Sequence, residues 1–278
     1  MYIGKRFQPG CRALQPETKA RLFYDEAGSL RLPQLFRIIW MPRTKTKSAA
    51  AAALAALNAR IVACTRCPRL REYTANIAVT KRRAYLDHDY WGLPVPSFGD
   101  PDARVLLVGL APGAHGSNRT GRPFTGDGSG AFLFPVLYEA GFASQPIATK
   151  RDDGMQLHDA WITSVVRCAP PDNKPLPSEI ANCAPYLDEE MAALKNLRVI
   201  VCLGKIGFDG VVQHLIRSGE IARRGDLHFA HGAEYKLPNG RFLLATYHPS
   251  LQNTNTGKLT NAMFYAIFRR ARELAGLN

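Results

Sequence analysis

Short apolar runs rich in Val, Ile and Leu alternate along the chain with segments of helical periodicity. The runs that predict strands are Arg104–Leu110, Trp161–Val166, Arg198–Leu203 and Phe242–Tyr247. Helical spacing predicts helices over Ala131–Glu139, from an N-cap near Ser178, over Phe208–Arg217, and around Met263, Phe264, Ile267 and Phe268. Strands that alternate with helices predict a three-layer α/β/α fold, with a central, mostly parallel four-stranded sheet.

The first 50 residues show no sustained hydrophobic period and run into an alanine-rich stretch at residues 48–54. We interpret residues 1–50 as a disordered basic extension, with Met41 as a plausible alternative start. The whole chain has 36 Lys and Arg against 23 Asp and Glu, a formal net charge of +13 that favours a polyanionic partner. Because the first 50 residues hold 10 of the basic and 3 of the acidic residues, the rest is only modestly basic.

No apolar run approaches the roughly 18 residues needed to cross a bilayer, and no secretory signal is evident. We therefore expect a soluble, cytoplasmic protein whose six cysteines are reduced thiols or metal ligands rather than disulfides. Four of them form two local pairs, Cys64 with Cys67 and Cys168 with Cys183. Four thiolates suit either tetrahedral zinc or an iron–sulfur cluster, and the spacing does not separate the two.

Polar segments follow three of the predicted strands directly, over residues 109–127, 167–174 and 248–258. Because ligands of parallel sheets bind beyond the carboxyl ends of the strands, we expect these segments to line one crevice. Their composition suits phosphate and base-edge recognition, although long turns are an alternative. The glycines at 126, 128 and 130 lie too far after the strand for a dinucleotide fingerprint. The candidate phosphate contacts are Arg119, Arg122, Lys174 and Lys258.

Two of these segments resemble the motifs of the uracil-DNA glycosylase superfamily, specifically its family 5, also called type b. The first motif is matched by Gly109–Gly113, Asn118–Phe124 and Asp127, and the second by His248–Ser250 and Asn253–Gly257. The resemblance covers roughly residues 58–275. It implies the three-layer fold, an iron–sulfur uracil-DNA glycosylase domain over residues 58–275, and a [4Fe–4S] cluster on Cys64, Cys67, Cys168 and Cys183.

The resemblance also implies roles for individual residues around a base flipped out of DNA. Phe124 would stack on the base, Asn173 would lie near its polar edge, and backbone N–H groups around Ala111 and Gly113 would contact it. His248 would hydrogen-bond the base carbonyl and stabilise negative charge as the N-glycosidic bond breaks. The alternatives are a core aromatic for Phe124 and a structural histidine for His248.

The first motif carries Ala111 where related families have Asp, Glu or Asn, so no carboxylate acts from that position. We expect catalysis to rely on stabilising the departing base anion and the cationic sugar, with Asp127 and Asn118 as candidates for orienting water. Ala111 also fits a pocket that accepts several deaminated bases. Leu251 is either a wedge that enters the vacated base stack or a loop residue that caps the core.

The sequence thus predicts a monomeric base-excision repair enzyme that acts on DNA. It would hydrolyse the N-glycosidic bond of uracil and of other deaminated bases, such as hypoxanthine and xanthine, leaving an abasic site. The main alternative is a non-catalytic damaged-DNA-binding protein on the same scaffold, because the acid of the first motif is absent. A third is an iron–sulfur or zinc electron-transfer or assembly protein, which leaves the Asn- and Arg-rich loops without a purpose.

Overall fold

A six-stranded sheet forms the centre of the computed structural model, which describes residues 49–277. The strands are β1 (Phe98–Gly99), β2 (Val105–Gly109), β3 (Ala160–Ser164), β4 (Val199–Leu203), β5 (Glu234–Lys236) and β6 (Phe242–Thr246), in the order β1-β3-β2-β4-β6-β5. The four inner strands are parallel, as predicted, whereas β1 and β5 pair antiparallel at the two edges. The predicted four-stranded sheet is two strands too small, because both edge strands are short and lack a buried apolar run.

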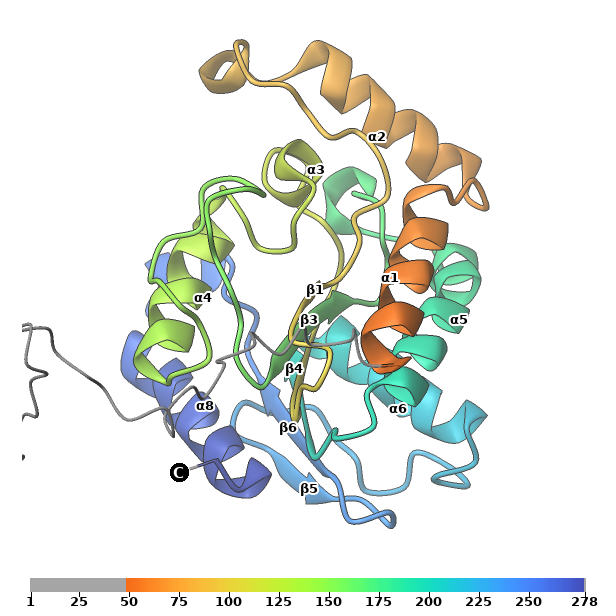
Figure 1. Cartoon of the computed structure of the whole chain (residues 1–278), viewed down its shortest axis with the longest axis vertical. Coiled ribbons are helices and arrows are strands. Elements are labelled where there is room, and N and C mark those ends of the chain that lie inside the picture. The colour runs from red at the N-terminus through yellow and green to blue at the C-terminus, as the bar shows by residue number, and fades with distance from the viewer. Residues whose placement is uncertain (1–48, 278) are drawn as a thin grey trace, which may run out of the picture. The chain divides into compact units, whose positions relative to one another are not determined.

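Helices cover both faces of this sheet, which confirms the three-layer fold (Figure 1). Successive side chains of the inner strands point to opposite faces, and β2 and β4 are buried at every position. The side chains of one face pack with α4 (Gly128–Glu139) and α8 (Asn261–Ala275). The other face packs with α1 (Ala49–Val62), α5 (Pro177–Ala193) and α6 (Lys205–Arg217).

The alanine-rich stretch that precedes the predicted domain is the start of helix α1. Alanine has the highest helix propensity, and Leu54, Leu57 and Ile61 follow at helical spacing and are buried. Helix α1 therefore begins at Ala49 and includes residue 58, where the resemblance begins. The predicted extension lies outside the described residues, apart from the two alanines at its end.

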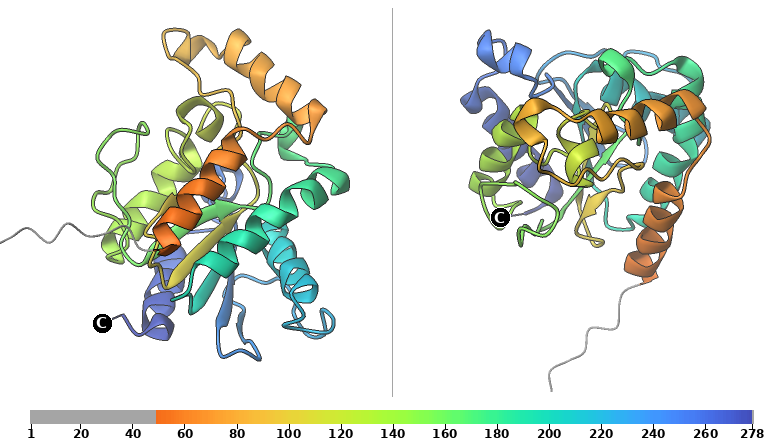
Figure 2. Two further views of the ribbon diagram at one scale, coloured as in Figure 1. Left: turned by 45° about the vertical axis from the view of Figure 1, so that its right-hand side comes forward. Right: turned by 90° about the horizontal axis from the view of Figure 1, so that it is seen from above.

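Helix α2 (Pro68–Thr80) lies across the carboxyl end of the sheet, as the two views in Figure 2 show. Shorter elements in the same region are η2 (Arg83–Tyr85), α3 (Ser117–Thr120), η3 (Pro171–Asn173) and α7 (Leu251–Asn255). Ser178 is not the N-cap of α5, because the helix begins one residue earlier, after Leu176. Within the described part of the chain, every helix is too short or too polar to cross a membrane.

Candidate active site

A cavity of about 500 Å³ opens at the carboxyl ends of the parallel strands, among the loops that follow β2, β3, β4 and β6. This is the end of the sheet at which parallel α/β folds bind their ligands. The three polar segments meet there. Six of the candidate residues line the cavity: Ala111, Gly113, Phe124, Asp127, Asn173 and His248.

His248 lies two residues beyond the end of β6 and faces Phe124. Its backbone oxygen accepts hydrogen bonds from Ser250 N–H and from Asn253 Nδ2, each at 2.8 Å, which fix the start of the loop. Burial lowers the pKa of His248 to about 4 from its ordinary 6.5. The imidazole is therefore neutral near pH 7, with one ring nitrogen as a hydrogen-bond donor.

Phe124 forms one wall of the cavity and also belongs to the hydrophobic core on the α4 side of the sheet. Its side chain is 8% exposed, and a Cβ atom built on Gly109 would lie only 3.0 Å from its Cζ. The ring centroids of Phe124 and His248 are 5.9 Å apart. Phe124 is therefore a core aromatic whose ring also lines the cavity.

Asp127 connects the cavity to helix α4. One carboxylate oxygen accepts the Gly130 N–H at 2.9 Å and caps the helix. The other lies against the loop after β2, so closely that a Cβ atom at Gly116 would be 1.8 Å from it. Burial raises the pKa of the Asp127 carboxyl above its ordinary value, and hydrogen bonds from the N–H groups of Gly130 and Ser129 offset only part of this rise. Asp127 is thus an acceptor held at the cavity wall.

Asn173 reaches the cavity from a tight turn after β3. Asp172 and Asn173 have φ angles of 54° and 57°, in the left-handed region that Asp and Asn tolerate better than most residues. The Lys174 N–H closes the turn by donating to the Pro171 oxygen at 2.9 Å. This backbone geometry places both side-chain positions beside the cavity.

The four paired cysteines come together beside the cavity-lining loop after β3. Cys64 follows α1, Cys67 is the N-cap of α2, Cys168 follows β3 and Cys183 lies within α5. All four are free thiols, and all except Cys64 are buried. Burial, together with the neighbouring thiols, raises the pKa of Cys168 to about 12 and that of Cys183 to about 11.

N–H donors surround these thiols. Arg71 hydrogen-bonds Cys168 and the Arg167 N–H donates to Cys183, while Asn182 Nδ2 lies 3.5 Å from the Cys67 sulfur. Such donors are typical of iron–sulfur sites. In residues 49–277, no group of three or more His, Cys, Asp or Glu is placed to hold a single metal ion. The donor set itself, four cysteine thiols, suits either a zinc ion or an iron–sulfur cluster.

Comparison with known proteins identifies the family of the chain. A model of the uracil DNA glycosylase superfamily matches residues 96–272. The chain belongs to the uracil-DNA glycosylase superfamily.

Type-5 uracil-DNA glycosylases are among its most similar relatives. The chain is 50% identical over 218 residues to that of Thermus thermophilus, an alignment that covers 78% of this chain and 96% of the relative. It is 45% identical to that of Mycobacterium leprae, over 83% of this chain and 99% of the relative. It is 42% identical to that of Pyrobaculum aerophilum, over 78% and 91%. The family assignment made from the motifs is confirmed.

Two of the candidate site residues, Asn118 and Leu251, lie outside the cavity lining of this uracil-DNA glycosylase. Asn118 is completely buried, and its Nδ2 donates to the backbone oxygens of Thr74 and Ala114, both at 3.3 Å. Leu251 is 57% exposed and packs over Gly128 at the start of α4. Leu251 is thus near the cavity without forming its wall, whereas Asn118 ties the loop after β2 to helix α2.

Two of the four candidate phosphate contacts are buried, and the prediction is wrong for them. Arg119 is 6% exposed and donates to backbone oxygens of its own loop. Arg122 is 2% exposed and pairs with Asp153. Lys174 and Lys258 are exposed, and both remain available to a phosphate.

The cavity also includes residues that the sequence patterns do not single out. They are Val95, Ser164, Leu203, Gly204, Lys205 and Ile206. Four of these lie where β4 passes into α6, and a single residue, Gly204, separates the strand from the helix. The one available signal was a glycine placed directly between a strand and a helix, the position at which a close backbone approach occurs.

Proposed function

We propose that the chain removes uracil, and other deaminated bases such as hypoxanthine and xanthine, from DNA by hydrolysing the N-glycosidic bond. As a superfamily member with type-5 relatives, it is a DNA repair glycosylase. The proposal concerns which bases it removes and which residues act on them. The observation that carries it is a neutral His248 beside Phe124 in the lining of a base-sized cavity.

The cavity suits a flipped base. A volume of about 500 Å³ lies in the range of small-molecule sites, so it can hold one base with part of its sugar. Phe124 offers an aromatic face for stacking, and Asn173 offers amide groups for the polar edge of the base. The backbone around Ala111 and Gly113 supplies further hydrogen-bonding groups.

His248 supplies the main catalytic interaction. As the N-glycosidic bond breaks, the base gains negative charge and the sugar becomes an oxocarbenium-like cation. A neutral imidazole N–H directed at the base carbonyl stabilises the departing anion most strongly when that charge is largest. Because the imidazole is uncharged beforehand, it does not repel the cationic sugar that forms beside it.

Asp127 is the better candidate for orienting the attacking water. It lines the cavity, whereas Asn118 is buried behind the loop after β2 with its amide donors already used. The Asp127 carboxylate also places negative charge beside the sugar. Ala111 leaves space without a carboxylate of its own, which suits a pocket that accepts more than one base.

We further propose that Cys64, Cys67, Cys168 and Cys183 hold a [4Fe–4S] cluster. When bound, the cluster supplies a rigid four-point link between elements distant in sequence. Cys168 and Cys183 bracket the loop that carries Asn173, so the cluster would fix that loop without a redox step.

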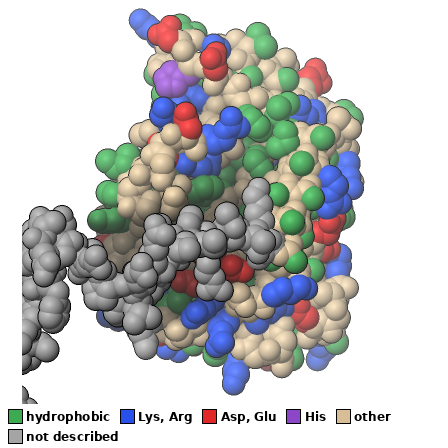
Figure 3. Space-filling model, in the orientation of Figure 1, with side chains coloured by type: hydrophobic (Ala, Val, Ile, Leu, Met, Phe, Trp, Pro, Cys, Tyr) green, Lys and Arg blue, Asp and Glu red, His purple; other side chains and the backbone are tan. Residues whose placement is uncertain are grey.

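DNA would bind over the mouth of the cavity. Lys174 and Lys258 are exposed in two of the cavity-lining loops, and the Lys258 Nζ lies 4.7 Å from the centre of the Tyr247 ring. Figure 3 shows basic and acidic side chains interspersed on the visible part of one face of the molecule. We propose a monomer, because one chain supplies every lining residue, and a cytoplasmic location, where free thiols persist.

Abasic-site formation on labelled oligonucleotides tests this function. Duplexes that contain uracil, hypoxanthine or xanthine at one position would be incubated with the iron-loaded protein and then cleaved with alkali. We expect cleavage at uracil and at the other deaminated bases, and none at thymine in the matched duplex. DNA binding without cleavage at any base would instead favour the non-catalytic damage-binding protein.

A further inference from the structure

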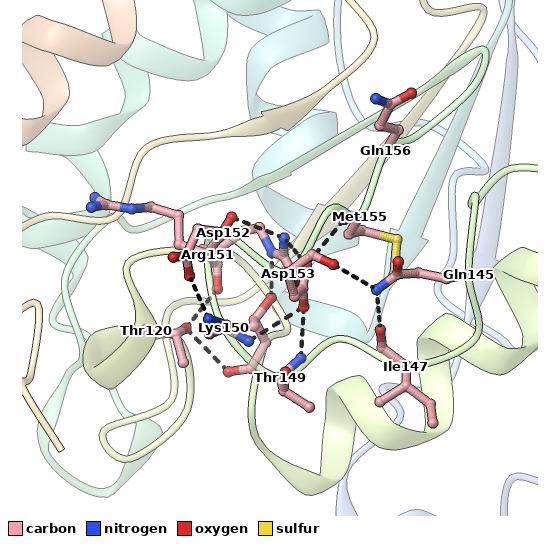
Figure 4. A network of polar contacts seen from close by, with 12 residues as sticks. Thr120, Gln145, Ile147, Thr149, Lys150, Arg151, Asp152, Asp153, Met155 and Gln156 are labelled. Carbon is pink, nitrogen blue, oxygen red and sulfur yellow. Dashed lines mark hydrogen bonds and ion pairs between the residues drawn. The ribbon is translucent and has the colours of Figure 1, made fainter. Parts of the chain in front are cut away.

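A single carboxylate organises the surface loop that precedes β3. The Asp153 loop, residues 145–155, turns around the Asp153 side chain, which is only 8% exposed (Figure 4). The N–H groups of Thr149 and Met155 donate to its two oxygens at 2.8 and 3.0 Å, and the Lys150 N–H lies at 3.3 Å. Burial alone would raise the pKa of Asp153, but hydrogen bonds from Arg122 and these N–H groups hold it well below its ordinary value.

Arg122 connects the Asp153 loop to the turn at the cavity wall. Its guanidinium binds both oxygens of Asp153, at 2.8 and 2.7 Å, and its side chain is 2% exposed. The Nε of the same guanidinium donates to Thr125 Oγ1 at 2.9 Å, and Thr125 Oγ1 in turn donates to the Pro123 oxygen at 3.1 Å. The Arg122 side chain therefore holds both ends of the turn that carries Phe124.

That turn is held in a conformation that its sequence does not favour. Phe124 has a φ angle of 51°, in the left-handed region that bulky residues rarely adopt. A second link ties the turn to the Asp153 loop, because the Gly126 N–H donates to the Ala148 oxygen at 3.1 Å. Such a conformation persists only where the surrounding contacts impose it.

We propose that Asp153 is a positioning residue, whose ion pair with Arg122 holds Phe124 in the geometry that presents its ring to the base. Asp153 does not line the cavity and touches no substrate. The inference rests on the proposed function, because it requires that a base stack on Phe124. It also explains why Arg122 is buried instead of contacting phosphate.

The test is the affinity of the iron-loaded protein for free uracil, measured as inhibition of uracil release from DNA. Asp153→Asn keeps the size of the side chain but removes the charge that fixes Arg122. We expect it to weaken inhibition by uracil between about 5-fold and 100-fold, the range of base stacking on an aromatic ring. Affinity for DNA with an abasic-site analogue, which has no base to stack, should change by less than about twofold.

Glu234→Gln is the matched control, because Glu234 also forms a two-pronged pair with an arginine, Arg270, on the far side of the fold. It should leave uracil inhibition unchanged. In a Phe124→Ala background, Asp153→Asn should have no further effect on uracil inhibition, since Asp153 acts through Phe124. If Asp153→Asn shows no cooperative unfolding, Arg122→Lys replaces it in the same comparison, because lysine keeps the charge but lacks the two-pronged geometry.

Parental inhibition by uracil in the Asp153→Asn protein would overturn the inference and leave the proposed function intact. An equal loss with and without Phe124 would also overturn it, because Asp153 would then act on the fold in general. Failure of the parent protein to release uracil would instead remove the proposed function, and the inference with it.

Discussion

Gly204 and His248 pack against each other beyond the ends of two neighbouring parallel strands. A Cβ atom built on Gly204 would lie 3.0 Å from the Cβ of His248. Strands β4 and β6 pair with Leu203 opposite Thr246, and Gly204 lies one residue and His248 two residues beyond this pair. The position of the His248 ring therefore depends on the absence of a side chain on the adjacent strand end.

Replacing Gly204 with alanine should both slow the reaction and destabilise the fold. The added methyl group would lie only 3.0 Å from the His248 Cβ, so His248 must shift by a few tenths of an ångström. Since a displacement of about 1 Å costs about 100-fold in rate, we expect a loss of about tenfold. The φ angle of 90° at Gly204 would strain an alanine there, which lowers the free energy of unfolding by about 1–3 kcal/mol. Single-turnover uracil release and urea unfolding measure the two effects separately.

Gly219→Ala is the control for that substitution. Gly219 also has a positive φ, 75°, but a Cβ atom there would meet nothing within 4 Å. Gly219→Ala should lower the free energy of unfolding without slowing uracil release. Equal rates for the parent and Gly204→Ala would show that His248 does not depend on Gly204.

The low pKa of His248 makes stability depend on pH. The folded protein binds this proton only near pH 4, whereas the unfolded chain binds it near the ordinary 6.5. Stability linked to His248 is therefore fully present above pH 6.5 and is lost as the pH falls toward 4. In the parent protein, the free energy of unfolding should fall between about pH 7 and about pH 4.5. In His248→Gln, this fall should be smaller by about 1–3 kcal/mol, a range that allows for solvent screening because the ring faces an open cavity. Identical pH dependence of urea unfolding in the two proteins would contradict a buried neutral imidazole.

The sheet and the crevice were predictable from sequence because both depend on contrasts between neighbouring residues. The parallel strands are buried on both faces and read as continuous apolar runs, and the polar loops begin where those runs end. Edge strand β5 has no such contrast, since its three residues alternate between exposed and half-buried positions.

Whether a charged side chain in a loop is buried or exposed was not predictable in the same way. Arg122 occurs in a glycine-rich loop and Lys174 in a proline-rich one, yet only Arg122 is buried. Its partner, Asp153, lies 31 positions away in sequence, and only the folded chain brings the two together. Gly204 was missed for a similar reason, because the residue it accommodates, His248, belongs to another strand end.

Leu251 should matter for duplex DNA and not for single strands. A wedge fills the space that a flipped base leaves in the stack, and single strands have no such stack to maintain. Leu251→Ala should slow uracil release from duplex DNA by about tenfold, while changing stability by less than about 0.5 kcal/mol because the side chain is largely exposed. Ile147→Ala, at a side chain that is 66% exposed, is the control and should change neither rate. An equal slowing on single-stranded and duplex DNA would favour the role of a core-capping loop residue.

The cysteine cluster should contribute to folding. Cys168→Ser should lose iron and visible absorption, and lower the free energy of unfolding by about 3 kcal/mol or more, because the binding energy of such a group is folding energy. Cys202 lies in β4, outside the four-thiol group. Cys202→Ala should keep its iron, and its free energy of unfolding should fall by about 1 kcal/mol because the substitution leaves a small cavity. An iron-free Cys168→Ser protein with parental stability and activity would contradict the structural role of the cluster.

The most direct test of the central claim is the single-turnover rate of uracil release by His248→Ala, measured beside its affinity for the same DNA. The account predicts a rate about 100-fold to 1000-fold below the parent, the effect of removing one donor to a developing anion, with DNA affinity within about twofold. A parental rate in His248→Ala would show that His248 does not stabilise the departing base, and would place the chemistry elsewhere in the cavity.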